Sequence, residues 1–265
     1  MDAIFQTATD MFQRLDVVWT FFLLCSRYTG LFLLLPGIGG GPMGIYIRYP
    51  AILVLSAVSL DMQLVAPMPD NWAILSAQIS TELLFGFAMG MIPLMLVSGV
   101  QLAGHMSSTA MGLGAGNLMD PTLGVMVTDI SRLFGDLTVI LFLLMGGHHV
   151  LIYAVSGVGL GIVPGSLLLT DGSADLLIRL SADIFSAGVM MSAPVVVALL
   201  LTQFVMGLIT KAVPTVNVFV MSFPLTIGIG LVLTVLSMPE IYALLRTQFN
   251  EMPRAIDALI VHSVP

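Results

Sequence analysis

The sequence predicts an all-α integral membrane protein with about six hydrophobic segments and with kinked or broken helices. Two observations lead to this fold class. First, 58% of the 265 residues are hydrophobic and only 9% are charged, whereas soluble domains carry about 25% charged residues. Second, most of the apolar residues fall into blocks that reach the length of roughly 20 residues needed by a membrane helix. The apolar faces must therefore be covered by lipid or by partner subunits.

The hydrophobic segments follow one another with short interruptions. In chain order they are 17–35, 50–60, 72–104, 123–147, 150–163, 184–209 and 216–238. The second is the shortest, because eleven residues rise only about 16 Å as a helix, half of a bilayer core. We expect this segment to extend in both directions, to be re-entrant, or to pack against protein.

Pro93, Pro194 and Pro224 lie inside these segments, and Pro214 lies between the last two. A proline removes a backbone donor and kinks a helix, so the freed carbonyls need other partners. Segment 72–104 is accordingly either one kinked helix or two half-helices. Broken helices mark binding sites in many transporters, but they also simply bend helices to fit an assembly.

No polar linker divides the chain, so we expect one helical unit over residues 1–265. Within it, 1–104 holds the N-terminal hydrophobic helices, 105–121 a glycine- and methionine-rich loop, and 122–265 the C-terminal hairpins and tail. The eight Lys and Arg residues form no cluster, which argues against a nucleic-acid partner. Cys25 is the single cysteine, so no intrachain disulfide and no cysteine metal site is expected.

The segment 105–121 reads H-M-S-S-T-A-M-G-L-G-A-G-N-L-M-D-P. Its alternate glycines suit neither a helix nor an ordinary strand, and its methionines are adaptable apolar side chains. The pattern indicates either a movable seal or a plain connecting loop. The candidate sealing residues are Met106, Met111, Gly112, Leu113, Gly114, Ala115, Gly116, Asn117, Leu118 and Met119.

Glu82, Gly86 and Gly90 recur at i+4 spacing and share one helix face. The two glycines let another helix approach closely. A carboxylate on that face is expensive in hydrocarbon, so it should face protein or water. Glu82 either lies near the helix end and reaches the lipid headgroups, or it takes part in a proton relay.

Asp129, Arg132 and Asp136 lie along one stripe at i, i+3 and i+7 and could neutralise one another. The stripe is either a solvated ion ladder or a polar seam that faces another subunit or an aqueous passage.

Motifs of known enzymes are absent, and we expect no enzyme, no cofactor and no metal site. The sequence contains no H-E-x-x-H, no G-x-S-x-G and no phosphate loop. His148 and His149 are adjacent, which predicts that they point to different sides of a helix rather than forming an i, i+4 metal pair.

Several stretches together resemble the FliR family of membrane proteins in the bacterial flagellar type III secretion system. They occur in the family's order over nearly the whole chain: T-E-L-L-F-G-F-A-M-G (81–90), N-L-M-D-P (117–121), L-F-L-L-M-G-G-H-H-V-L-I-Y-A-V-S (141–156), V-P-G (163–165) and A-V-P-T-V-N-V-F-V-M-S-F-P-L-T-I-G-I-G-L (212–231). Pro214, Asn217 and Pro224 lie in the last stretch. They are candidate helix-packing and interface residues, together with Glu82, Gly86, Gly90, Asp129, Arg132 and Asp136.

The resemblance implies a subunit of the export gate in the inner membrane, at the centre of the flagellar basal body. Its expected partners are FliP, FliQ and FlhB, together with membrane lipid and the unfolded flagellar proteins that the gate exports. In this family the helices pack largely against other subunits in a hetero-oligomeric assembly, and the loop before D-P helps to plug the closed channel. The loop here is richer in glycine than is usual for the family.

Three alternatives remain open from the sequence. The injectisome counterpart of this family is similar, so the cargo is either flagellar or virulence protein. A secondary transporter for a small solute would place its site at Glu82 and near Pro93 and Pro224. An intramembrane enzyme is the third, and no motif supports it.

Overall fold

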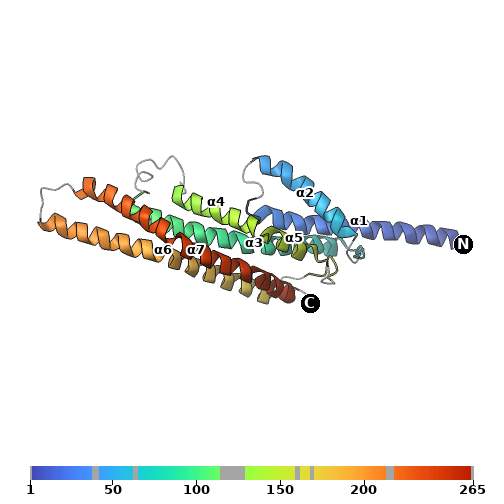
Figure 1. The fold of residues 1–265 in the computed structure, drawn as a ribbon. Coiled ribbons are helices and arrows are strands. Elements are labelled where there is room, and N and C mark those ends of the chain that lie inside the picture. The colour runs from blue at the N-terminus through green and yellow to red at the C-terminus, as the bar shows by residue number, and fades with distance from the viewer. Residues whose placement is uncertain are drawn as a thin grey trace. The chain divides into compact units, whose positions relative to one another are not determined.

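A computed structural model of the chain contains seven α-helices within the residues that it describes (Figure 1). It describes the chain outside residues 1, 38–41, 62–64, 114–128, 159–161, 168–169, 213–217 and 264–265, and only the backbone at 2–14, 42–43, 129 and 218–220. The helices are α1 (Asp2–Leu34), α2 (Pro42–Leu60), α3 (Trp72–Met111), α4 (Asp129–Leu144), α5 (Gly147–Ser156), α6 (Asp171–Ala212) and α7 (Val218–Ser263).

Four of the described helices, α1, α3, α6 and α7, are long and apolar enough to cross a membrane. Helices α4 and α5 make a fifth candidate span if they are taken together, although the chain bends by 64° between them. The bend lies at Gly146, whose φ of 73° is one that side chains other than glycine rarely adopt. The predicted segments 123–147 and 150–163 thus contribute one bent pair, and the apolar part of α2 is too short to count as a span.

The prolines inside α2, α3 and α6 do not end these helices. Segment 72–104 is therefore a single helix that contains Pro93 and continues to Met111. The short segment 50–60 extends backwards to Pro42, a residue suited to the first turn of a helix because its missing N–H has no partner there anyway.

The chain divides into two compact units. The first unit comprises residues 1–94, 142–180 and 251–265. Within it α2 packs against α1, as Figure 1 shows. The hydroxyl groups of Tyr28 and Ser59 meet at 2.8 Å between these two helices, and both side chains are buried.

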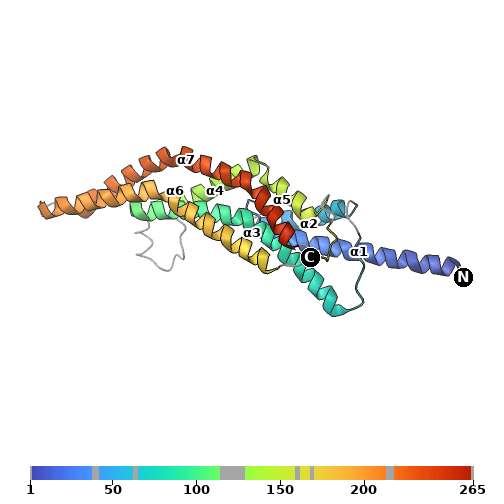
Figure 2. The same cartoon turned by 90° about the horizontal axis from the view of Figure 1, so that it is seen from below.

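The second unit comprises residues 95–141 and 181–250. Its part of α6 runs beside α3 (Figure 2). Glycine permits this approach, because a Cβ atom added at Gly188 would overlap the backbone of Gly99. Helix α4 meets α3 in the same manner, since a Cβ atom at Gly104 would lie 2.8 Å from the Cα atom of Ser131.

Candidate functional site

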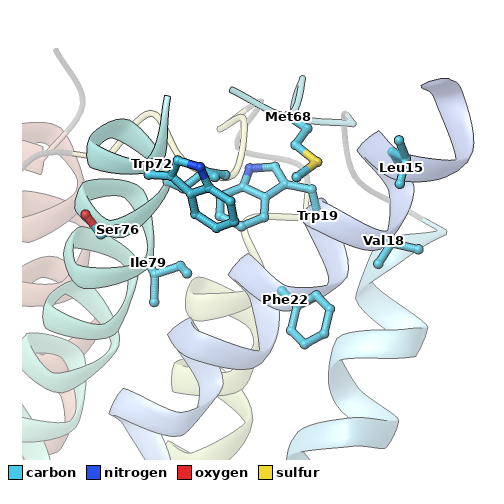
Figure 3. A pocket seen from close by; sticks show the side chains of 9 residues that line it. Leu15, Val18, Trp19, Phe22, Met68, Trp72, Ser76 and Ile79 are labelled. Carbon is cyan, nitrogen blue, oxygen red and sulfur yellow. The ribbon is translucent and has the colours of Figure 1, made fainter. Parts of the chain in front are cut away.

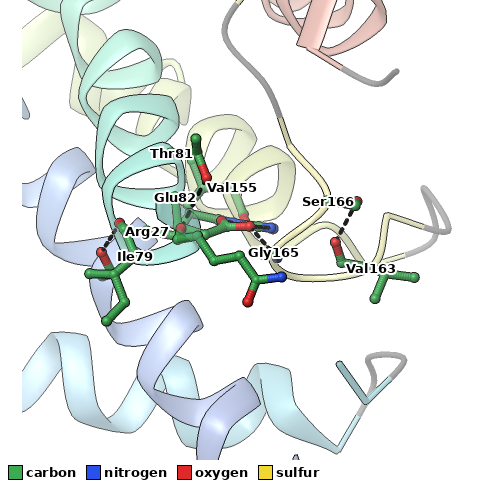
Figure 4. Close-up of polar contacts among 10 residues, drawn as sticks. Arg27, Ile79, Thr81, Glu82, Val155, Val163, Gly165 and Ser166 are labelled. Carbon is green, nitrogen blue, oxygen red and sulfur yellow. Dashed lines mark hydrogen bonds and ion pairs between the residues drawn. The ribbon is translucent and has the colours of Figure 1, made fainter. Parts of the chain in front are cut away.

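A buried ion pair joins α1 to α3 inside the first unit (Figure 4). Arg27 donates from Nε to Glu82 Oε2 at 2.5 Å and from a terminal nitrogen to Glu82 Oε1 at 3.0 Å. Both side chains are fully buried. The guanidinium also lies over the Phe85 ring, 5.6 Å from its centroid. Because the contact is two-pronged, it fixes the rotation of each helix as well as their distance.

Two backbone groups complete this ion pair. Arg27 donates to the carbonyl of Val155 at 3.1 Å, and the Gly165 N–H donates to Glu82 Oε1 at 2.6 Å. Gly165 follows Pro164 in a turn closed by the Ser166 N–H and the Val163 carbonyl. Proline followed by a glycine with φ of 87° is the pattern of a type II turn, which leaves the glycine N–H free for the carboxylate. The charges therefore hold the segment after α5 onto α1 and α3.

Three glycines allow α1 and α3 to cross closely beside the ion pair. A Cβ atom at Gly86 would overlap the Arg27 carbonyl oxygen, and one at Gly90 would lie 2.9 Å from the Leu31 carbonyl oxygen. From the other helix, a Cβ atom at Gly30 would lie 2.7 Å from the Phe87 nitrogen. The helix that approaches the Glu82, Gly86 and Gly90 face is thus α1 of the same chain.

The C-terminus of α3 lies in the second unit and has hydrogen-bond donors for three of its last four carbonyl groups. The Leu113 and Gly112 N–H groups donate to the Ser108 and Thr109 carbonyls, with Gly112 at a φ of 88°. This arrangement is a Schellman motif. A side chain caps the third carbonyl, since Gln203 of α6 donates to Ala110 at 3.0 Å. The Thr226 hydroxyl of α7 lies 3.2 Å from the Met111 carbonyl, but its single proton has a nearer acceptor in the Ser222 carbonyl of its own helix, at 2.9 Å.

Met111 is the buried centre of this helix end. Its side chain is fully buried and forms a cluster with Val195 and Leu199 of α6. Gly230 of α7 leaves room for it, because a Cβ atom there would lie 2.8 Å from the Met111 methyl carbon. Helices α6 and α7 therefore hold the residue at which the glycine-rich segment begins.

Alanine at Gly230 is expected to disturb the Met111 cluster, at a cost of about 1–3 kcal/mol in unfolding free energy from overpacking. Gly228 of the same helix is the matched control, because a Cβ atom there meets nothing within 4 Å. Survival of the membrane-extracted chain after heating would compare Gly230→Ala with Gly228→Ala. Equal survival of the two variants would contradict the packing described.

The predicted loop differs from the structure at its start. Residues 105–111 are helical, so Met106 and Met111 belong to α3, and the chain leaves the helix at Gly112. The reason is that residues 105–111 are compatible with a helix, whereas Gly112 adopts a φ of 88°, which ends it. Gly114, Ala115, Gly116, Asn117, Leu118 and Met119 lie outside the described residues, as do Pro214 and Asn217.

The predicted charge stripe on α4 is only partly described. Arg132 and Asp136 are exposed, and no ion pair links these two described side chains. For Asp129 the structure describes the backbone alone. Pro224 lies within α7. The rings of His148 and His149 lie 3.9 Å apart, so the prediction that they point to different sides of a helix is wrong at the first turn of α5.

Sequence reasoning missed Arg27, Gly30 and Gly165 as members of one site. A signal for the first was present, since Arg27 is the single charge in the first apolar segment and Glu82 the single charge in the third. Opposite charges in two membrane segments are expected to pair. No comparable signal marks Gly165, whose contact depends on a turn 83 residues further along the chain from Glu82.

Much of α6 and α7 is apolar and exposed in the isolated chain. In the most apolar 18-residue stretch of α6 only 33% is buried, and in that of α7 only 22% is buried. The exposed large side chains on these helices include Val197, Leu201, Phe204, Val232, Val235 and Leu236. Surfaces of this extent mark contacts with lipid or with other proteins.

Comparison with known proteins matches residues 18–252 to the family described as "Bacterial export proteins, family 1". The chain is 24% identical over 242 residues to the flagellar biosynthetic protein FliR of Bacillus subtilis (strain 168), covering 89% of this chain and 92% of the relative. It is 24% identical over 233 residues to FliR of Caulobacter vibrioides, covering 87% and 92%. FliR of Escherichia coli (strain K12) is 28% identical over 171 residues, covering 64% and 66%.

Proposed function

This chain belongs to the bacterial export proteins, family 1, and from that premise we propose that it forms part of the channel of the flagellar type III export gate. It is a multi-pass membrane protein of flagellar export, suited to the bacterial inner membrane. The substrates of the proposed channel are unfolded flagellar proteins. The chain acts there without chemistry of its own, by lining and closing a passage.

The proposed partners are FliP, FliQ and FlhB. The long apolar faces of α6 and α7 support a place in a larger assembly, because most of their apolar windows is exposed in the isolated chain. Side chains such as Leu201 and Phe204 would be covered by sibling subunits rather than only by acyl chains. We expect the chain expressed alone to aggregate or to be short-lived, and co-purification with these three proteins to stabilise it.

In the proposed mechanism, the segment from Gly112 to Met119 occupies the passage at rest and moves aside for an exported chain. It contains no charged residue. The capped C-terminus of α3 is the observation that carries this proposal. Three of the four terminal carbonyls have hydrogen-bond donors and Met111 is fully buried, so the segment leaves from a fixed point. A movable plug needs such an anchor, because otherwise the helix end would unravel with it.

Stiffening the segment tests the mechanism. Replacement of Gly112, Gly114 and Gly116 by alanine is expected to reduce secretion of flagellar proteins, since alanine loses conformations that glycine reaches freely. At Gly112 the positive φ alone should cost about 1–2 kcal/mol. Ala115→Gly, which keeps the segment flexible, is the matched control and should secrete normally.

Deleting residues 114–118 gives the second measurement. This variant is expected to raise the ion conductance of the membrane, because the passage would lose its seal. The segment is only a connector if the alanine variant secretes normally and the deletion variant leaves the ion conductance of the membrane as low as the parent chain does.

Two of the three alternatives left open by the sequence bear on further observations. Secretion of flagellar against virulence cargo by cells that carry this chain would decide between the flagellar gate and an injectisome gate. The solute transporter gains nothing from Glu82, because both of its carboxylate oxygens already accept hydrogen bonds from Arg27 and Gly165.

A further inference from the structure

An apolar groove opens where α1 and α3 begin their membrane-spanning parts, within the first unit (Figure 3). We call it the tryptophan groove, since it contains both tryptophans of the chain. Its volume is about 390 Å³. It is lined by Leu15, Val18, Trp19, Phe22, Met68, Trp72, Leu75, Ser76 and Ile79.

We propose that the tryptophan groove binds one acyl chain of a membrane phospholipid whose headgroup carries an ammonium, such as phosphatidylethanolamine. Size is the first argument. A pocket of this volume is typical of small-molecule sites, whereas a partner helix about 10–12 Å wide could not enter it. An acyl chain is thin, flexible and wholly apolar. Eight of the nine lining side chains are apolar too, apart from the two indole nitrogens.

The tryptophans give the second argument, because tryptophan gathers where the hydrocarbon core meets the headgroups. Trp19 is 8% exposed, and its ring nitrogen donates to Gln78 at 3.2 Å. Its polar atom therefore has a protein partner, and its ring serves as an apolar wall. Trp72 is 85% exposed on the other side of the groove. Two such rings at the start of two spans place the groove at the level where an acyl chain begins.

Charge at the rim gives the third argument and selects the headgroup. The Asp16 side chain accepts the Met68 N–H at 2.7 Å, which places its carboxylate beside a residue of the groove. Asp70 is exposed between Met68 and Trp72. None of the nine lining residues is basic. Carboxylates attract an ammonium and repel a purely anionic headgroup.

Photolabelling of the full chain in isolated bacterial membranes tests the proposal. The membranes are loaded with phosphatidylethanolamine that carries a diazirine in its acyl chain, or with phosphatidylglycerol that carries the same acyl chain. Mass spectrometry then locates the lipid adducts along the chain. We expect phosphatidylethanolamine to label the groove segments 15–22 and 68–79 more strongly than phosphatidylglycerol does.

Two variants fill the groove from opposite walls, Ser76→Phe on α3 and Val18→Phe on α1. Each is expected to lower labelling of the groove about tenfold, which corresponds to the loss of about two buried methylene groups. Ala77→Phe is the matched control, because Ala77 is exposed next to Ser76 but does not line the groove. Labelling in this control should equal that of the parent chain, and all variants are compared at equal amounts of chain in the membrane.

A separate variant, Asp16→Asn, tests which headgroup the groove prefers. Asp16→Asn keeps an oxygen that accepts the Met68 N–H but removes the charge. It should abolish the preference for phosphatidylethanolamine and leave the total labelling intact. The proposal is overturned if the two lipids label the groove equally in the parent chain. It is also overturned if Ser76→Phe and Val18→Phe label as Ala77→Phe does, or if the groove crosslinks to another protein and takes no lipid.

Discussion

Glu82→Gln is expected to destabilise the first unit by about 3–5 kcal/mol, the range found when one partner of a buried ion pair is removed. Arg27 would remain in a fully buried position without a counter-charge. Thermal survival of the chain, extracted from the membrane and measured by size-exclusion chromatography, would report the loss. Such a change is a large fraction of the roughly 5–15 kcal/mol by which native proteins are stable.

A double variant separates the charge effect from general damage. Arg27→Met together with Glu82→Gln is expected to recover part of the lost stability, because no unpaired charge remains. Recovery should be incomplete, since the Val155 carbonyl loses the donor that Arg27 supplies. The stability changes of the two single variants and the double variant would therefore be far from additive.

The exposed pair Arg179 and Asp175 provides a control for the loss of an ion pair as such. These side chains are 75% and 60% exposed and lie one helical turn apart on α6. Arg179→Gln should change the unfolding free energy by less than about 0.5 kcal/mol, because water and salt screen such a pair. A Glu82→Gln variant as stable as Arg179→Gln would contradict burial of the Arg27 charge.

Gly86→Ala is expected to have the second large effect, a loss of about 3 kcal/mol or more in unfolding free energy. The added methyl group would overlap the Arg27 carbonyl oxygen, which belongs to the backbone and cannot turn away as a side chain can. Helices α1 and α3 would have to separate, and this movement would stretch the two hydrogen bonds between Arg27 and Glu82. The same heating assay measures the result.

Gly207→Ala is the matched control for that substitution. Gly207 is helical, and a Cβ atom there would meet nothing within 4 Å. Alanine in a helix interior is better than glycine by about 0.5–1 kcal/mol, so this variant should be as stable as the parent chain or slightly more so. Gly30→Ala, which approaches the same crossing from α1, should behave like Gly86→Ala. If Gly86→Ala and Gly207→Ala had equal stability, the close crossing would be wrong.

The fold class could be predicted from the sequence because it depends on composition and on the length of apolar segments. Boundaries were harder to predict. From the sequence, Pro93 was compatible with one kinked helix or with two half-helices. The structure has a single helix there, and this outcome depends on packing that a sequence does not display. His105–Met111 likewise resembled a loop, because three alternate glycines follow it, although the helix continues to Met111 and ends at Gly112.

The candidate site was predictable only in part, because several of its contacts join residues that are far apart in the sequence. The face of Glu82, Gly86 and Gly90 follows from helical periodicity, a local property. Its partner Arg27 lies 55 residues earlier, and the Val155 carbonyl lies 128 residues after Arg27. Contacts over such separations depend on the tertiary fold. A search for opposite charges in separate membrane segments would have found the arginine but not the backbone groups.

The burial of Arg27 and Glu82 in two different spans has a consequence for biosynthesis. A lone arginine or acidic residue at the centre of a span raises the free energy of insertion by about 2.5–3.5 kcal/mol. Both charges have left the ribosome once α3 is made, long before Val155 and Gly165 are translated. We therefore expect α1 to remain at the translocon until α3 arrives, so that the two helices enter the bilayer as a neutral pair.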